Sequence, residues 1–191
     1  MGLGNPGQPY QKTRHNLGWM VLEHAAHRWG IPLTQQGHVL QGQGEIRGCP
    51  VLLALPLVWM NQTGEVVPFL LRSQNSTSSD LILVYDDLDL PLGGLKIKTR
   101  GGPGGHNGLR SVLACLGTEN FSRLKLGIGR PPQGEDPAHY VLSSFSPDEK
   151  RAVETLLPRA VDALECMMFE GIQEAMNRFH APPIPKESDE Q

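Results

Sequence analysis

Residues 81–93 read LILVYDDLDLPLG, an apolar run that ends in closely spaced carboxylates. Residues 81–85 form a short apolar segment of residue types that favour β-structure. This pattern predicts a buried strand that ends at Asp86. In open α/β sheets, ligands bind beyond the carboxyl ends of such strands. This stretch therefore predicts an α/β fold with a functional site at Asp86. Three acids this close together also suit a cation such as Mg²⁺, which is the lesser expectation.

Other segments repeat the pattern of a strand. Residues 94–100 and 123–128 alternate between apolar side chains and basic or small ones, as half-buried strands do. Residues 39–46 and 51–55 predict a hairpin with its turn at residues 47–50.

Helices are predicted between these strands. Residues 17–29 carry apolar side chains at helical spacing, and Gly30 with Pro32 marks the end. Shorter helices are expected at residues 64–72, with Pro68 in the early turns, and at residues 107–116.

The C-terminal part of the chain begins with a strong helix signal. Ser146-Pro147-Asp148-Glu149 combines an N-cap serine, a proline at the first helical position and a glutamate that completes a capping box. The helical pattern continues to about Phe179, and Pro158 is expected to divide it into two helices. Strands that alternate with helices predict a single α/β domain over residues 1–180, followed by a flexible tail at residues 181–191.

Composition argues against several classes of protein. The longest nearly apolar run, residues 51–60, contains Pro56 and is shorter than the ~20 residues that a membrane-spanning helix needs. No signal peptide is indicated. The three cysteines form no CxxC pair, so neither a disulfide framework nor a zinc site is predicted. We expect a cytoplasmic protein without a membrane partner.

Charge is unevenly distributed. The whole chain has a net charge of −3, but residues 93–131 contain seven basic residues against one acid, a net charge of +6. A basic stripe on an acidic body is typical of a phosphate-bearing partner. A solvated strand face with lysines explains the same pattern equally well.

The chain opens with Gly2-Leu3-Gly4-Asn5-Pro6-Gly7, which matches the dinucleotide-binding pattern GxGxxG. That pattern needs a strand before it and a helix that starts within it. Asn5-Pro6-Gly7 instead predicts a turn. A nicotinamide-dependent enzyme is therefore a minor alternative, and we expect no cofactor.

Three further strings carry residue types that suit catalysis or binding. These are TRHN at residues 13–16, WMNQTG at residues 59–64 and GGPGGHNGL at residues 101–109. Each also has an ordinary explanation: a surface histidine, an asparagine that caps a helix, or a mobile glycine loop. No single string decides between these interpretations.

Together and in order, the strings resemble bacterial-type peptidyl-tRNA hydrolases. GLGNPG, TRHN, MNQTG, DDLDLPLG, GGHNGL and RLKLGIGRP follow one another from Gly2 to about His180. The resemblance implies a twisted mixed β-sheet packed between α-helices, a monomer, and activity without metal or cofactor. It also implies the family's reaction, which is hydrolysis of the ester between a peptide and the 3′-terminal ribose of peptidyl-tRNA.

The resemblance also implies roles for individual residues. His15 matches the catalytic base, Asp86 the carboxylate that orients it, and Asn5 the amide that recognises the peptide beside the ester. The expected substrate and tRNA contacts are Tyr10, Trp59, Met60, Asn61, His106, Asn107, Lys98 and Lys125. Among these, the amides bind substrate, the two larger aromatics flank the site, and the lysines lie near a tRNA phosphate.

The chemistry of these residue types agrees with ester hydrolysis. Histidine is suited to deprotonate water near neutral pH, and a carboxylate on its other nitrogen fixes the tautomer. No serine or cysteine occurs in a recognisable nucleophile setting. The chief alternative is a non-catalytic RNA-binding relative of the same fold, such as a splicing factor, which need not retain His15, Asp86 and the amides.

The chain departs from the family pattern in three places. Only Met1 to Leu3 remain where relatives have a longer strand, so we expect a truncated first strand. Lys125 stands where many relatives have arginine, which keeps the charge but loses bidentate geometry. Trp59 stands where a smaller aromatic side chain is usual.

Overall fold

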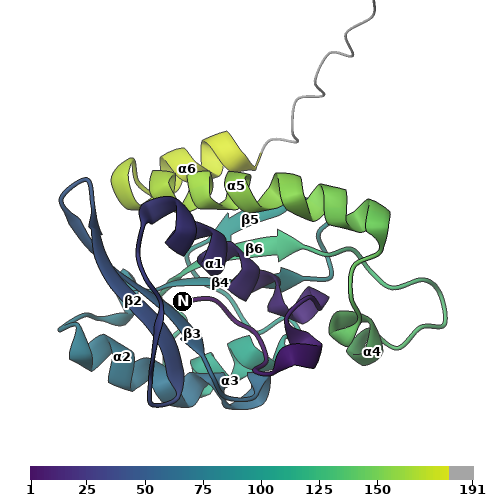
Figure 1. Ribbon diagram of the computed structural model, residues 1–191, viewed down its shortest axis with the longest axis horizontal. Helices are drawn as coiled ribbons and strands as arrows, with labels where there is room; N and C mark the ends of the chain where they lie inside the picture. The colour runs from purple at the N-terminus through teal and green to yellow at the C-terminus, as the bar shows by residue number, and fades with distance from the viewer. Residues whose placement is uncertain (181–191) are drawn as a thin grey trace, which may run out of the picture.

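Helices lie on both sides of a central layer of strands in the computed structural model, which describes residues 1–180 (Figure 1). One three-stranded sheet is antiparallel and consists of β1 (Thr34–Gln36), β2 (Val39–Ile46) and β3 (Cys49–Pro56), in that order. The other sheet has the order β4-β6-β5 and consists of β4 (Ile82–Asp87), β6 (Ser122–Gly127) and β5 (Leu95–Lys98). Because β4 is parallel to β6 and β5 is antiparallel to it, this second sheet is mixed.

The first residues of the chain join the two sheets. The Gly2 N–H donates to the Ala54 carbonyl of β3 at 3.0 Å, and the Leu3 N–H donates to the Val84 carbonyl of β4 at 2.9 Å. The Val84 N–H donates back to the Met1 carbonyl, and Gly2 pairs with Val84 in parallel orientation. Residues 1–3 therefore bridge β3 and β4 without forming a full strand, at the place where the sequence predicts a truncated first strand.

Two hydrophobic cores fill the spaces between strands and helices. The helices are α1 (Leu17–Trp29), α2 (Val67–Ser73), α3 (Asn107–Leu116), α4 (Pro137–Leu142), α5 (Pro147–Phe169) and α6 (Ile172–Phe179). Val84 of β4 packs in the core that contains residues of α1, α5 and α6, whereas Leu83 and Tyr85 pack in the core with residues of α2 and α3. Successive side chains of a strand point to opposite faces, so β4 is buried on both sides and its last residues emerge between the helices.

Most elements predicted from the sequence are confirmed. The hairpin between β2 and β3 turns at Arg47 and Gly48, whose φ angles are 51° and 80°, as a tight hairpin turn requires. At the start of α5, the Ser146 side chain accepts from the Glu149 N–H and the Glu149 side chain accepts from the Ser146 N–H, which completes the capping box. The short elements β1 and α4 were not predicted. The expected tail at residues 181–191 lies outside the described residues.

The prediction that Pro158 divides the C-terminal helix is wrong. Helix α5 runs from Pro147 to Phe169 and contains Pro158 in its interior. The break comes later, at Gly171, whose φ of 96° suits glycine far better than other residues. Leu156 and Ala160, on either side of the proline, are buried. Their packing holds the helix together although Pro158 removes one backbone hydrogen bond.

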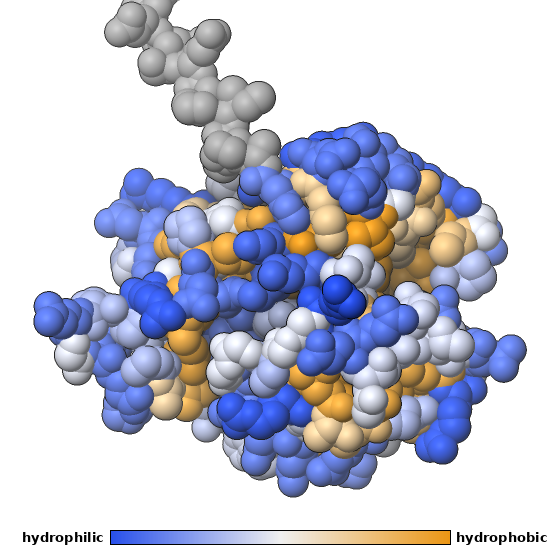
Figure 2. Space-filling view, turned by 180° about the vertical axis from the view of Figure 1, so that it is seen from behind, coloured by the Kyte–Doolittle hydropathy of each residue, from blue (hydrophilic) through white to orange (hydrophobic). Residues whose placement is uncertain are grey.

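The surface is mainly hydrophilic, as the face behind the view of Figure 1 shows (Figure 2). Among the described residues, the large hydrophobic side chains that are exposed are Trp59, Phe69 and Leu142. No helix in the described part of the chain combines the length and apolar character needed to cross a membrane.

Helix α1 approaches the strands closely because Gly18 has no side chain. A Cβ atom at Gly18 would lie 2.3 Å from the Val84 carbonyl oxygen and 2.7 Å from that of Leu3. Both contacts are with backbone, which cannot swing aside. Since His15 lies directly before α1, Gly18 sets the distance between His15 and β4.

We predict that Gly18→Ala lowers the unfolding free energy by about 1–3 kcal/mol, because overpacking forces the backbone apart. Thermal and urea denaturation measure the effect. Gly102→Ala is the matched control, because a Cβ there meets nothing within 4 Å. Equal stability of the two variants would contradict the close packing of α1 on β4.

Candidate active site

Asp86 lies at the end of β4 and holds two histidines. His15 Nδ1 lies 3.0 Å from both carboxylate oxygens of Asp86, and His106 Nε2 lies 3.1 Å from Oδ1. The two imidazole rings have their centroids 4.8 Å apart. Asp86 and His15 are buried, with 2% and 8% of their surface exposed. The structure thus brings together two predicted catalytic residues, His15 and Asp86, with His106, which was predicted as a substrate contact.

The hydrogen bonds fix the protonation of both rings. His106 caps α3, and its Nδ1 accepts from the Leu109 N–H at 3.2 Å, so its proton resides on Nε2 and is donated to Asp86. A carboxylate only accepts, so His15 donates from Nδ1 as well. The second ring nitrogen of His15, Nε2, therefore keeps its lone pair. That nitrogen is the basic atom of the cluster.

The same contacts shift two pKa values. Burial would raise the pKa of Asp86, but the two histidines and their hydrogen bonds outweigh it and hold this pKa far below the ordinary range. Burial would lower the pKa of His15, but the charge of Asp86 and the hydrogen bond to it outweigh burial and raise this pKa above 6.5. Asp86 is thus a permanent anion at neutral pH, and His15 is a strengthened base.

Asn5 is held in a fixed orientation near this cluster. Its backbone N–H donates to Asn16 Oδ1, and the Asn16 amide donates back to the Asn5 carbonyl, both at 2.9 Å. The Asn5 Oδ1 atom accepts from the Met60 N–H at 2.8 Å. No hydrogen bond joins the side-chain NH₂ of Asn5 to another described residue. This group is available to donate to a substrate oxygen.

Several of the predicted substrate contacts lie on the segments that carry Met60 and His106. Tyr10 and Trp59 meet edge to face with ring centroids 5.7 Å apart, and half of Trp59 is exposed. Asn61 is exposed, and so is Asn107, whose Oδ1 accepts from Arg110. Met60 is buried. The exposed aromatic face and amides are consistent with contact to a flexible substrate.

Met60 also packs against the helix that His106 caps. A Cβ at Gly108 would lie 2.4 Å from the Met60 sulfur. Gly108 therefore lets the start of α3, with its cap His106, lie close to the segment that positions Asn5.

The basic residues of the +6 segment differ in their environment. Lys98 is exposed on β5. Lys125 forms an ion pair with Asp87 and is mostly covered. Arg123 is buried, with its guanidinium 4.5 Å from the Phe121 ring centre, and Arg130 pairs with Asp89. The exposed positive charge of the segment is therefore on Lys96, Lys98 and Arg100, on β5 and just beyond it, and on Arg110 of α3, whose printed partner is the neutral Asn107 amide.

One group in the described part of the chain has the composition of a metal site. The ligand atoms of His15, Asp86 and His106 all lie within 4.8 Å of one another, and imidazole with carboxylate suits divalent transition metals. In this arrangement the carboxylate instead accepts a hydrogen bond from each imidazole. The three groups thus satisfy one another through these hydrogen bonds.

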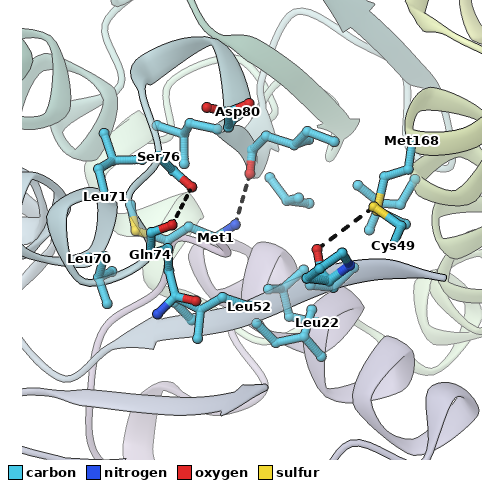
Figure 3. A pocket seen from close by; sticks show the side chains of 18 of the residues that line it. Met1, Leu22, Cys49, Leu52, Leu70, Leu71, Gln74, Ser76, Asp80 and Met168 are labelled. Carbon is cyan, nitrogen blue, oxygen red and sulfur yellow. Dashed lines mark hydrogen bonds between the residues drawn. The ribbon is translucent and has the colours of Figure 1, made fainter. Parts of the chain in front are cut away.

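A mostly apolar pocket of about 480 Å³ lies elsewhere, beside Met1. Figure 3 shows Met1 facing this pocket together with Leu52 of β3 and Asp80, which lies two residues before β4. The Met1 amine donates to the Ile82 carbonyl at 2.8 Å. None of the residues of the His15 cluster lines it. The pocket is thus separate from the candidate active site.

Two contributors to the site were not predicted as functional residues. Asn16 is fully buried and fixes Asn5, and Arg14 forms an extensive set of contacts next to His15. Both belong to the string TRHN. Their inclusion in one motif with His15 was the available signal, but nothing in the sequence states which side chain points where.

Comparison with known proteins identifies one family for this chain. The peptidyl-tRNA hydrolase family matches residues 1–188. The chain is 45% identical to the peptidyl-tRNA hydrolase of Symbiobacterium thermophilum, over 94% of this chain and 97% of that protein. It is 42% identical to that of Bacillus subtilis, over 94% and 96%.

Solved structures agree. A peptidyl-tRNA hydrolase in complex with N-propanol superposes with a TM-score of 0.90 at 34% identity, covering 96% of this chain and 94% of that one. The Acinetobacter baumannii peptidyl-tRNA hydrolase gives a TM-score of 0.89 at 34% identity, covering 94% and 92%.

We predict that Asp86→Asn lowers the pKa of His15, because burial then acts without the opposing carboxylate charge. NMR titration of the His15 ring protons measures this pKa in both proteins. In the wild type the raised pKa stabilises the fold below about pH 6.5, the unfolded-state value, and this stabilisation is lost as pH rises through the folded-state value. An unchanged His15 pKa in Asp86→Asn would rule out the electrostatic coupling.

Proposed function

This chain belongs to the peptidyl-tRNA hydrolase family, and we propose that His15 is the general base of its reaction. The reaction is hydrolysis of the ester that joins a peptide to the 3′-terminal ribose of tRNA. The observation that carries the proposal is the contact of His15 Nδ1 with both oxygens of Asp86 at 3.0 Å. It turns Nε2, the nitrogen with the lone pair, into the atom that accepts a proton.

In the first step, His15 Nε2 removes a proton from a water molecule while the water oxygen attacks the ester carbonyl carbon. The imidazole becomes positively charged, and the Asp86 carboxylate stabilises that charge without taking the proton itself. His106 supports Asp86 as a second hydrogen-bond donor. The histidine is held in the required tautomer before substrate arrives, so little reorganisation is needed during the reaction.

Attack of water converts the carbonyl oxygen into an oxyanion, which needs hydrogen-bond donors. The side-chain NH₂ of Asn5 is oriented by the Met60 N–H on the other side of the amide, and we assign it to this region of the substrate. Asn61 and Asn107 are further amides for binding the peptide or the ribose. When the intermediate collapses, the ribose oxygen leaves and takes the proton from His15, which restores the neutral base.

The exposed basic residues account for tRNA binding in this proposal. Lys98, with its neighbours Lys96 and Arg100, presents positive charge that suits a phosphate backbone without reading sequence. Lys125 lies on the adjacent strand β6 and is paired with Asp87. Its contribution depends on sharing its ammonium group between Asp87 and a phosphate.

We further propose that the protein works as a monomer in the cytoplasm. All catalytic and binding groups invoked above come from one chain, between Asn5 and Lys125, which supports a single catalytic domain over residues 1–180. The substrate is a product of translation, which takes place in the cytoplasm. The released tRNA is then free for reuse.

We expect His15→Ala to lower the turnover of peptidyl-tRNA by at least about 100-fold, the usual contribution of a general base. Binding of tRNA remains close to wild type, because His15 contacts the reacting water rather than the phosphates. Release of labelled peptide measures turnover, and filter binding measures affinity. His27→Ala, at an exposed position on α1, is the control. Wild-type turnover in His15→Ala would remove His15 from the mechanism.

We expect Lys98→Ala combined with Lys125→Ala to weaken tRNA binding and to flatten its salt dependence. Each lost phosphate contact lowers the slope of log affinity against log salt by about one unit or slightly less. Lys150→Ala, an exposed lysine at the start of α5, is the control. A slope equal to that of the wild type would show that neither lysine faces the tRNA.

A further inference from the structure

Arg14 precedes His15 in the chain but reaches a different part of the fold. Both residues belong to the 3₁₀ turn Arg14–Asn16 that leads into α1. His15 contacts Asp86, whereas the side chain of Arg14 extends to the segment between α4 and α5. Only 6% of Arg14 is exposed. A buried guanidinium needs hydrogen-bond partners. Both terminal nitrogens of Arg14 have them, whereas its buried Nε has none among the described residues. The partners of the terminal nitrogens therefore indicate what Arg14 holds in place.

The partners of Arg14 form a clamp on residues 143–149. One terminal nitrogen donates to the Ser143 hydroxyl at 2.6 Å, to its carbonyl at 3.2 Å and to the Ser144 carbonyl at 2.9 Å. The other donates to both carboxylate oxygens of Glu149, at 2.8 and 2.7 Å. The backbone is joined as well, because the Arg14 N–H donates to the Ser143 carbonyl and Thr13 pairs with Ser144.

The clamp is connected to the start of α5. Glu149 also accepts from the Ser146 N–H at 2.7 Å, as part of the capping box. Burial opposes ionisation of Glu149, but Ser146 and Arg14 hold its pKa below the ordinary value. Arg14 therefore pairs with a permanent anion on a helix of 23 residues, which is a rigid anchor.

A second connection leads back to the catalytic carboxylate. The Arg14 guanidinium carbon lies 4.1 Å from the centre of the Tyr140 ring, within range of a cation–π interaction. The Tyr140 hydroxyl donates to the Ile128 carbonyl at 2.8 Å, and the Ile128 N–H donates to the Asp87 carbonyl at 3.1 Å. Asp87 follows Asp86 directly. The contacts thus close a ring from Asp86 through Ile128, which directly follows β6, then Tyr140 and Arg14 to His15.

From this closed ring we propose that Arg14 is a positioning residue for His15, a role that rests on the proposed function of His15 as the base. The planar fork of arginine holds the backbone of the turn at residues 14–16 against α4 and α5. His15 Nδ1 is thereby kept opposite both oxygens of Asp86. Lysine at position 14 keeps the charge but has no fork, so the turn gains freedom and the geometry of the base loosens.

The test is Arg14→Lys in the full chain, with kcat, KM and the NMR-derived pKa of His15 measured together. We expect kcat to fall roughly 10- to 100-fold, because small misplacements of a catalytic group have effects of that size. KM remains unchanged and the His15 pKa falls, because contact with Asp86 weakens. Arg28→Lys is the matched control, since Arg28 on α1 pairs with Asp162 on α5 away from the site.

Chemical rescue supplies a second readout. In Arg14→Ala, guanidinium ion below its denaturing range is expected to restore part of kcat, whereas the same concentration of potassium chloride does not. A pocket of about 400 Å³ lined by Arg14, Tyr140 and Glu149 gives the ion access. If Arg14→Lys does not fold, the same kinetic and pKa measurements are made on Glu149→Gln, which removes the charge of the carboxylate that Arg14 contacts.

Three outcomes would overturn the proposal. These are an unchanged kcat in a folded variant, a change confined to KM, and a lower melting temperature with kcat and His15 pKa unchanged. Failure of the proposed function is recognised separately, because wild-type turnover in His15→Ala leaves the pKa measurements on Arg14→Lys fully interpretable.

Discussion

A carboxylate buried at the end of β4 requires hydrogen-bond donors, since an unpaired buried charge costs several kcal/mol. In this protein the donors to Asp86 are His15, which precedes β4 in the sequence, and His106, which follows it. Hydrogen bonds engage both ring nitrogens of His106 but only Nδ1 of His15, so the lone pair on Nε2 of His15 is left to accept a proton. The hydrogen bonds that satisfy the buried carboxylate of Asp86 therefore also prepare His15 to act as a general base.

The rest of the fold brings these donors to the carboxylate. Residues 1–3 place the chain between β3 and β4, so that Asn5 emerges beside the end of β4. Gly18 lets α1 lie on those strands, and His15 lies just before that helix. His106 both caps the N-terminus of α3 and donates a hydrogen bond to Asp86. Catalytic geometry and secondary structure therefore depend on the same contacts.

Much of this arrangement could be predicted from the sequence, for identifiable reasons. Local sequence patterns indicate both elements: an apolar run predicts β4, and a capping box predicts the start of α5. The pairing of Lys125 with Asp87 and the engagement of both His106 nitrogens depend on strand register and helix placement. Such contacts between distant segments leave no local pattern. Pro158 shows the reverse case, in which tertiary packing overrides a local helix-breaking signal.

Asp86 holds His15 in one tautomer, with the proton on Nδ1 and the lone pair on Nε2. Nitrogen-15 NMR of the ring, at a pH above the pKa of His15, tests this most directly, because the two tautomers have distinct chemical shifts at each nitrogen. We expect a protonated Nδ1 and an unprotonated Nε2. A proton on Nε2 in the neutral ring would contradict this assignment, because the lone pair would then lie on Nδ1, against Asp86, and not on the nitrogen proposed to activate water.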